Sequence, residues 1–462
     1  MFKFATRKTI ILMSSIFYTI RKTLKDYTTG SNILLVATAL ALIIVNLPGC
    51  HDFYNGLWTH EIALQVGSFN LFSHNGHAMS IIDFVNDALM AIFFFSVGLE
   101  IKREMIVGEL RSFRQALLPI IGACGGMIIP VCIYSLFAYG TDYQGGSAIP
   151  MATDIAFSLG VLTMLGNRVP ISLKIFLTTL AVVDDIGGIL VIAIFYSSDI
   201  NLWMLLVAAG LLGLLALGGK MQIQSKMFYF GIGIIVWFLF LNAGIHPTIA
   251  GVLVALTVPA RPLFDPRKYI DTIRRNVGHF AKEDDDKLDS HTILSPDQMS
   301  WLKEIESASD KVISPLQELE DSLHPLVNWI IIPLFAFANA GIYLGDVTFA
   351  SMFEGVSLSI IGGLVLGKFI GIFTFSWAAI KLKLAPMPKM SNWKMMASVS
   401  MVGGIGFTVS LFIATLSFAN PEHLSFLNPA KLGILVGSLI AGILGYLMLR
   451  VTLPKEPVAD ID

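Results

Sequence analysis

Twelve apolar runs follow one another along this chain, and they constrain its fold more than any other feature. A transmembrane α-helix needs about 20 consecutive, predominantly apolar residues. The runs lie at about 31–48, 85–101, 116–138, 149–166, 171–196, 202–219, 227–243, 247–260, 325–344, 356–380, 395–418 and 429–450. Only 14% of all residues are charged, whereas soluble domains have about a quarter. We therefore predict an all-α integral membrane protein with about twelve transmembrane helices, the eighth being short.

The positions of Lys and Arg predict how these helices are oriented. Cytoplasmic loops of membrane proteins collect these two residue types. Every second loop contains neither of them, and these loops lie at about 49–84, 139–148, 197–201, 244–246, 345–355 and 419–428. Each intervening loop carries at least one Lys or Arg. We predict a multi-pass protein of the cell inner membrane with both termini in the cytoplasm.

The remaining charges divide the chain into segments. Residues 265–321 hold 22 of the chain's 64 charged residues, including Asp284 to Asp286. The stretch that begins at Trp301 is typical of either a surface helix or a solvated linker, and we favour the linker. The predicted segments are 1–30 (N-terminal), 31–260 (helices one to eight), 261–324 (cytoplasmic loop), 325–452 (helices nine to twelve) and 453–462 (cytoplasmic tail).

The N-terminal segment, Met1 to Tyr27, combines basic residues with a short apolar run. This pattern is typical of a signal peptide or of an amphipathic segment that lies on a membrane surface. No small-residue cleavage site follows it before the first predicted span. We favour an uncleaved segment on the cytoplasmic face.

Net charge and cysteine usage exclude several classes of function. The net charge of −2 lacks the strong excess of basic residues that is typical of nucleic-acid-binding proteins. The three cysteines, Cys50, Cys124 and Cys132, are scattered in or beside apolar runs. We therefore expect neither a disulfide framework nor a resident metal site.

Four of the apolar runs contain side chains that lipid should reject. Asp184 and Asp185 lie in the fifth run, Asp154 in the fourth and Lys368 in the tenth. A charge at the centre of a bilayer costs about 3 kcal/mol on insertion scales. A single buried Asp can be a structural hydrogen-bonding group, but three Asp and one Lys at similar depth indicate a functional site. Lys368 at the depth of the two adjacent acids also predicts a buried ion pair.

The fourth and eleventh runs are interrupted by Gly, Pro, Thr and Ser residues. Each is the middle member of a triplet, helices 3–5 in the first half and helices 10–12 in the second. Interrupted helices in corresponding halves indicate inverted repeats around a transport site. We therefore predict that helices 4 and 11 are discontinuous and cross each other inside the protein. Asp154 would offset their positive N-terminal ends and Lys368 their negative C-terminal ends.

The motifs at these positions resemble those of the NhaA family of Na+/H+ antiporters. They are Ala152-Thr153-Asp154-Ile-Ala-Phe157, Val183-Asp184-Asp185, Gly367-Lys368, Gly404-Ile-Gly406-Phe-Thr408 and Val97-Gly-Leu-Glu100-Ile-Lys-Arg103-Glu104. They occur in the family's order between about residues 30 and 452. This family is a known example of inverted repeats, so the resemblance and the triplet pattern are not independent.

The resemblance implies a function and a set of site residues. Na+ or Li+ and H+ would compete at Asp185 and Asp184, with Thr153 lending an oxygen to the ion. Asp154 would balance the crossed helix ends and Lys368 would pair with Asp184. Small hard cations do prefer carboxylate and hydroxyl oxygens. Electrogenic export of Na+ against inward protons would then regulate the Na+ content and pH of the cell.

Further expectations follow from the same resemblance. Gly404, Gly406 and Thr408 would form the interruption of helix 11. Candidate pH-sensing residues are Glu100, Arg103, Glu104, His246, Glu320 and His324, although the first three and the last two also fit an ordinary charged helix flank. The resemblance implies no cofactor. It implies a protein that lies in the lipid bilayer and forms a homodimer. Asp321, Phe369 and the long acidic loop depart from the family's pattern. Asp321 and the loop affect the expected pH set point, and none of the three touches the ion-coupling residues.

Two other classes of protein also place acids in a membrane. An intramembrane aspartyl protease needs two Asp on separate helices, usually in Tyr-Asp and Gly-x-Gly-Asp contexts, and neither context occurs here. A Na+-coupled solute symporter could share the crossed-helix fold. Na+-dependent proton movement without an organic solute distinguishes an antiporter from a symporter.

Overall fold

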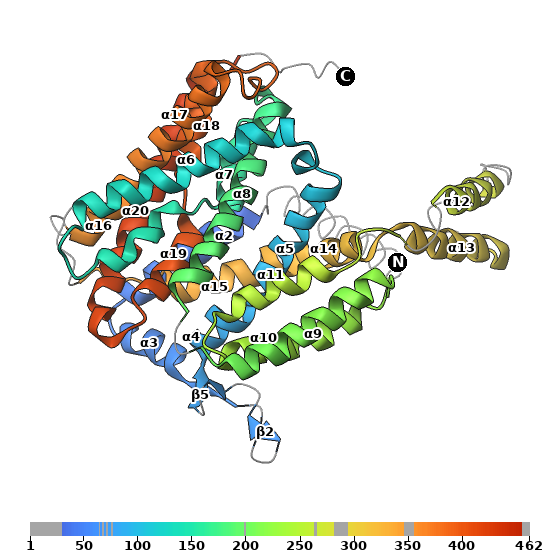
Figure 1. The fold of residues 1–462 in the computed structure, drawn as a ribbon, viewed down its shortest axis with the longest axis horizontal. Helices are drawn as coiled ribbons and strands as arrows, with labels where there is room; N and C mark the ends of the chain where they lie inside the picture. The colour runs from blue at the N-terminus through green and yellow to red at the C-terminus, as the bar shows by residue number, and fades with distance from the viewer. Residues whose placement is uncertain are drawn as a thin grey trace, which may run out of the picture. The chain divides into compact units, whose positions relative to one another are not determined.

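The computed structural model describes residues 30 to 454, apart from 64, 67–68, 71–72, 75–76, 198–199, 263–265, 281–293 and 346–354. Figure 1 shows the chain as a ribbon. The predicted N-terminal segment, the Asp284 to Asp286 run and most of the predicted C-terminal tail lie outside the described residues.

The described residues are predominantly helical, as predicted. Eight helices are long and apolar enough to cross a membrane, and two bent pairs raise this number to ten. The eight are Ile81–Ile106 (α4, η1 and α5), Phe113–Phe137 (α6), Gln144–Met164 (η3 and α7), Ile171–Phe195 (α8), Leu202–Lys220 (α9), Pro315–Asn339 (α14, η6 and α15), Gly355–Lys381 (α16, η8 and α17) and Pro421–Thr452 (η9 and α20). Two shorter apolar helices, α10 (Lys226–Asn242) and α11 (Pro247–Thr257), complete the correspondence with the twelve predicted runs. Pro at the first position of α11 provides its start signal.

The two bent pairs differ in how sharply the chain turns. Helices α2 (Gly30–Asn46) and α3 (His51–Thr59) meet at 117°, and Gly49 between them has φ +81°. Glycine adopts this left-handed conformation without the steric cost that a side chain would impose. Helices α18 (Trp393–Val402) and α19 (Phe407–Ser417) meet at 46°. The second bend is the interruption predicted for helix 11.

Five short strands between residues 61 and 80 were not predicted. They are β1 (Glu61–Ile62), β2 (Gln65–Val66), β3 (Phe69–Asn70), β4 (Ser73–His74) and β5 (His77–Ser80). All pairs are antiparallel, in one sheet of order β1-β5-β4 and one of β2-β3. Strands this short carry too little periodicity to be detected from sequence.

The chain folds into two compact units. The first contains residues up to 90, 112–196 and those from 326 onward. In it α17 (Lys368–Lys381) packs along α6, where the backbones of Gly125 and Gly371 approach so closely that a Cβ on either would collide with the other's carbonyl oxygen. Gly367 lies directly against Pro130 of α6, so Gly367 and Gly371 both allow the two helices to pack closely beside Lys368.

The second unit contains residues 91–111 and 197–325. Helices α9, α10 and α11 pack on one another within it. Helix α5 (Met90–Ile106) approaches α11 through Gly98 and Gly251, where a Cβ on either residue would collide with the other helix. Thus glycines permit close helix contact in both units.

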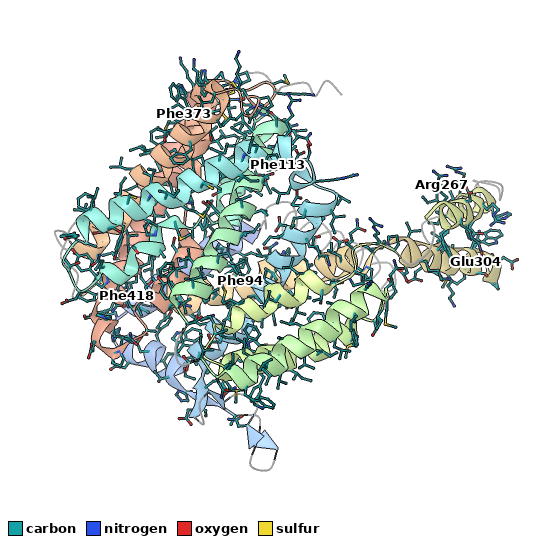
Figure 2. All side chains as sticks on the ribbon, viewed as in Figure 1. Phe94, Phe113, Arg267, Glu304, Phe373 and Phe418 are labelled. Atoms are coloured by element: carbon teal, nitrogen blue, oxygen red, sulfur yellow. The ribbon has the colours of Figure 1, made fainter. Side chains whose placement is uncertain are left out.

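The stretch that begins at Trp301, for which we favoured a solvated linker over a surface helix, lies in the second helix of an antiparallel hairpin, so the favoured interpretation was wrong and the helix was the correct alternative. The helices of the hairpin are α12 (Pro266–Phe280) and α13 (Pro296–Val312), and Figure 2 labels Arg267 and Glu304 on them. Asn276 Nδ2 donates to Glu304 Oε2 at 2.8 Å, and the His279 and Trp301 rings stack at 5.2 Å. A capping box at Ser295 starts α13. These contacts between distant residues order a segment whose composition alone favoured a solvated chain.

Candidate ion-binding site

The two discontinuous helices of the first unit meet at their interruptions. Helix η3 (Gln144–Met151) ends before α7 (Ile155–Met164) begins, and α18 ends at Val402 before α19 begins at Phe407. The Asp154 N–H donates to the Ile405 carbonyl at 2.7 Å. The sequence prediction that helices 4 and 11 are interrupted and meet is therefore confirmed.

Hydroxyl groups join each interrupted helix to the other. Ser410 Oγ of α19 donates to the Ile149 carbonyl of η3 at 2.8 Å. In return, Ser158 Oγ of α7 donates to the Val402 carbonyl of α18 at 3.3 Å. Carbonyls at the C-terminal end of a helix lack partners within that helix. The two helices thus satisfy each other's ends in a place where water is scarce.

One carboxylate serves both positive helix ends. Asp154 Oδ1 accepts from the N–H of Phe157 at 3.0 Å, in the first turn of α7. Its Oδ2 accepts from Thr408 N at 3.0 Å and from Thr408 Oγ1 at 2.6 Å, in the first turn of α19. A negative charge at a helix N-terminus is stabilising. The geometry therefore agrees with the offset of positive helix ends predicted for Asp154.

Ser438 of α20 (Leu427–Thr452) also caps α19, and the sequence analysis missed it. Its Oγ accepts from Gly406 N at 3.3 Å and from Phe407 N at 3.2 Å. Ser438 is only 7% exposed. The only indication of this role in the sequence is a hydroxyl group within the apolar run of α20. The sequence does not show which backbone groups that hydroxyl would bond.

The Asp184 carboxylate, the Thr153 hydroxyl and the Lys368 ammonium form a compact buried cluster. Lys368 Nζ donates to Asp184 Oδ2 and, at 2.9 Å, to Thr153 Oγ1. Both side chains of the ion pair are 0% exposed. The structure thus contains the ion pair between Asp184 and Lys368 that the sequence predicted. Because the opposite charges are adjacent and hydrogen-bonded, each lowers the cost of burying the other.

Thr153 has two possible acceptors for its single hydroxyl hydrogen. Its Oγ1 lies 2.6 Å from Asp184 Oδ2 and 3.0 Å from the carbonyl oxygen of Gly403, at the end of α18. A hydroxyl donates only one hydrogen bond at a time. The choice between these acceptors therefore connects the charge on Asp184 with the interruption between α18 and α19.

The ion pair with Lys368 leaves the second oxygen of the Asp184 carboxylate without a partner among the described residues. Asp184 Oδ1 is buried and has no hydrogen-bond partner among the described residues. Asp185, the next residue along α8, is 4% exposed and close enough to Lys368 to interact with it electrostatically. A buried acceptor without a donor is costly. A small cation or a proton would satisfy it.

Four of the six candidate pH-sensing residues gather in the second unit. Arg103 Nη1 lies 2.8 Å from Glu320 Oε1, and Arg103 Nη2 lies 3.2 Å from Glu104 Oε1. Glu100 lies within electrostatic range of all three. The Arg103 side chain is 37% exposed and that of Glu320 is 15% exposed. This cluster is therefore partly solvated.

The two candidate histidines have different surroundings. His246 precedes α11 and its Nδ1 lies 2.9 Å from the Thr248 hydroxyl. His324 is exposed on α14 (Pro315–Leu326).

Comparison with known proteins connects this geometry to a family. Residues 21–449 match the family model described as "Na+/H+ antiporter 1". A protein of Phocaeicola vulgatus named "Na(+)/H(+) antiporter NhaA" is 52% identical over 93% of this chain and 95% of its own length. Proteins of the same name from Bacteroides fragilis and Bacteroides thetaiotaomicron are 52% and 51% identical, over 95% and 94% of this chain and 100% and 99% of their own lengths.

Proposed function

This chain belongs to the Na+/H+ antiporter 1 family, and on that premise we propose that it exchanges Na+ or Li+ for protons at Asp184 and Asp185. The family transports ions rather than catalysing a covalent reaction, which excludes the protease alternative, and it uses no cofactor. Na+ and H+ are the substrates.

The observation that carries this proposal is the buried carboxylate oxygen of Asp184, which has no hydrogen-bond donor among the residues that the structure describes. The other oxygen of the same carboxylate, Oδ2, accepts from the Thr153 hydroxyl at the interruption of two helices, and a second buried acid, Asp185, follows in the chain. Carboxylate and hydroxyl oxygens are the ligands that small hard cations prefer. In the proposed site, Thr153 contributes an oxygen, and Asp154, Gly404, Gly406 and Thr408 maintain the interrupted helices.

Exchange is obligatory if protons and Na+ compete for the same carboxylates. In the proposed cycle the site changes sides only when either a cation or protons neutralise Asp184 and Asp185. When Asp184 is occupied, its oxygens are weaker acceptors, so the Thr153 hydrogen turns toward the Gly403 carbonyl. That change of partner would transmit occupancy to the interruption of α18 and α19. Lys368 keeps part of the negative charge compensated in either state.

The direction and regulation of transport are part of the proposal. Lys and Arg in alternate loops support cytoplasmic termini, with segments 1–30, 261–324 and 453–462 on the inner side of an inner membrane. From that side Na+ would leave the cell in exchange for entering protons, in an electrogenic cycle. The cluster of Glu100, Arg103, Glu104 and Glu320, with His246 and His324, is proposed to respond to pH. The protein would assemble as a homodimer.

Inside-out vesicles with an imposed pH gradient test the proposed exchange. Adding NaCl or LiCl should dissipate the gradient, whereas KCl should not. Asp185→Asn should abolish the response, and Asp142→Asn, at an exposed loop position, should leave it unchanged. Full activity in Asp185→Asn would refute the site assignment. Na+ uptake that requires an organic solute would favour a symporter instead.

A further inference from the structure

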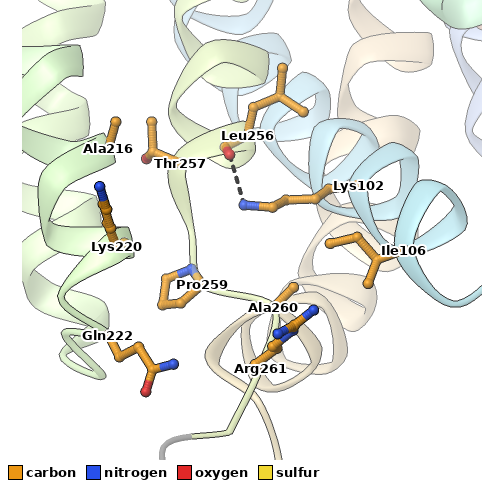
Figure 3. Close-up of a pocket in the computed structure, with 11 residues that line it drawn as sticks. Lys102, Ile106, Ala216, Lys220, Gln222, Leu256, Thr257, Pro259, Ala260 and Arg261 are labelled. Carbon is orange, nitrogen blue, oxygen red and sulfur yellow. Dashed lines mark hydrogen bonds between the residues drawn. The ribbon is translucent and has the colours of Figure 1, made fainter.

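The C-terminal end of α11 is bound by an ammonium group of α5, beside a pocket of the second unit (Figure 3). Lys102 Nζ donates to the carbonyl oxygen of Leu256 at 2.7 Å and to that of Val258. Figure 3 shows the first of these bonds as a dashed line. We propose that Lys102 is a positioning residue that couples the cluster around Arg103 to α11 and thereby sets how exchange responds to pH. This inference rests on the proposed exchange, whose regulation it specifies.

Both partners of Lys102 are backbone groups that α11 does not satisfy itself. The last carbonyls of a helix have no donor within that helix, and a cation is favourable at this negative end. Lys102 forms no ion pair with any residue that the structure describes. The other charged residues that line the pocket, Lys220 and Arg261, are also basic. The Lys102 ammonium is therefore fixed by the end of α11 and not by a carboxylate.

Helices α5 and α11 also pack closely along their length. A Cβ on Gly98 of α5 would lie 2.7 Å from the Ala255 side chain, and a Cβ on Gly251 of α11 would lie 2.3 Å from the Ala91 carbonyl oxygen. Apolar packing of this kind limits the distance between two helices but permits small sliding movements. The bonds from Lys102 to two carbonyls oppose such sliding. We therefore expect α5 and α11 to move together.

The same end of α11 is joined to α14. The Leu316 N–H, in the first turn of α14, donates to the Pro259 carbonyl at 3.2 Å. Helices α5 and α14 are in turn joined by the ion pair of Arg103 with Glu320, at 2.8 Å. Three elements are thus connected in pairs. Of these three connections, only the ion pair depends on the charge of a carboxylate.

A change of charge at the cluster can therefore displace α11. Protonation of Glu320 weakens its attraction for Arg103, so α5 can shift against α14, and α11 shifts with it because Lys102 binds its end. In the described part of the chain, Lys102 is not among the charged groups that act on Glu100 or Glu320. Those groups are Arg103, Glu104, Asp321 and the two acids themselves. Lys102 thus affects the pH response through position and not through its electric field.

Na+-dependent proton flux in inside-out vesicles from pH 6 to pH 9 tests this coupling. Lys102→Met should shift the midpoint of the pH profile by about half a pH unit, the size expected for one cation at a helix C-terminus, and should preserve the maximal rate. Lys102→Arg keeps the donors and should restore the profile. The control, Arg261→Gln, removes an exposed charge from the same pocket and should leave the profile unchanged.

A double variant shows whether Lys102 acts through the cluster. Arg103→Gln should shift the profile of the unmodified chain but add little to Lys102→Met, because the cluster is then no longer coupled to α11. Fully additive shifts would overturn the proposal. An equal shift in Arg261→Gln, or none in Lys102→Met, would overturn it as well. Lys102→Gln, which keeps an amide donor, should give a smaller shift and replaces Lys102→Met if that variant does not fold.

Hydrogen–deuterium exchange tests the coupling without any transport. In the purified full chain, protection of the amides of residues 254–260 should differ between pH 6 and pH 9 after correction for the intrinsic pH dependence. Lys102→Met and Arg103→Gln should each remove that difference, whereas Arg261→Gln should preserve it. A pH-dependent protection without Na+-dependent proton flux would refute the proposed exchange and leave the coupling intact. Flux without pH-dependent protection would refute the coupling alone.

Discussion

The ion pairs of the two units both join a cationic side chain to a carboxylate, but they differ in their exposure to solvent. Lys368 and Asp184 are both 0% exposed, whereas Arg103 and Glu320 are 37% and 15% exposed. Breaking a buried pair by removing one partner costs about 3–5 kcal/mol, because the other charge stays desolvated. An exposed pair contributes about 0–1 kcal/mol. An unbalanced charge is therefore costly at Lys368 and Asp184. The partly solvated cluster around Arg103 can gain or lose a charge at a much smaller cost in free energy.

The largest expected effect comes from breaking the buried pair. Lys368→Met should lower the melting temperature of the purified protein markedly, by the equivalent of about 3 kcal/mol or more, because Asp184 loses its counter-charge. The loss should be smaller at low pH, where the lone carboxyl is protonated. Thermal unfolding in detergent between pH 5 and pH 9 measures both effects.

A double substitution separates charge balance from transport at this pair. Asp184→Leu with Lys368→Met removes both charges and should recover much of the melting temperature without restoring Na+-dependent proton movement. If the double variant were as unstable as Lys368→Met, packing at the two positions rather than charge would explain the loss.

A smaller effect is expected at the helix ends around the site. Ser438→Ala leaves the N–H groups of Gly406 and Phe407 without an acceptor, and loss of such a cap costs about 1 kcal/mol. Exposing the positive end of α19 should also weaken cation binding and raise the KM for Na+. Vesicle assays over a range of NaCl concentrations measure this change.

Ser359→Ala provides the matched control for Ser438→Ala. Ser359 is also buried, but its hydroxyl donates to the Gly355 carbonyl within its own helix. Its removal should leave the KM unchanged. A KM shift of similar size in both variants would show that general loss of stability, not the cap on α19, alters the site.

The sequence predicted the charged members of the site better than the uncharged ones. Asp184 and Lys368 stand out because lipid rejects isolated charges, and similar depth in their runs was enough to pair them. Ser158, Ser410 and Ser438 do not stand out, because a hydroxyl is tolerated in an apolar helix when it bonds to that helix's own backbone. Which hydroxyls instead join different helices depends on packing between distant segments, and one sequence does not contain that information.

The same reason explains which parts of the fold were missed. Apolar runs are local, so nearly all helices were predicted close to their observed bounds. The α12–α13 hairpin depends on contacts such as Asn276 with Glu304 and His279 with Trp301, which join residues more than 20 positions apart. Local composition there is rich in charge and favoured a linker. Long-range pairing, not propensity, decided the outcome.

The smallest expected effect concerns the solvated cluster of the second unit. Arg103→Gln or Glu320→Gln should change the melting temperature only slightly, since an exposed pair contributes about 0–1 kcal/mol and salt screens it. Exchange should persist at its maximal rate, but its dependence on pH should shift, because Glu100 and Glu104 share the field of Arg103. Proton flux in vesicles from pH 6 to pH 9, at low and high KCl, measures the shift. A large loss of stability in either variant would show that the pair of Arg103 and Glu320 contributes as much as the buried pair of Lys368 and Asp184. The energetic difference between the two units would then not hold.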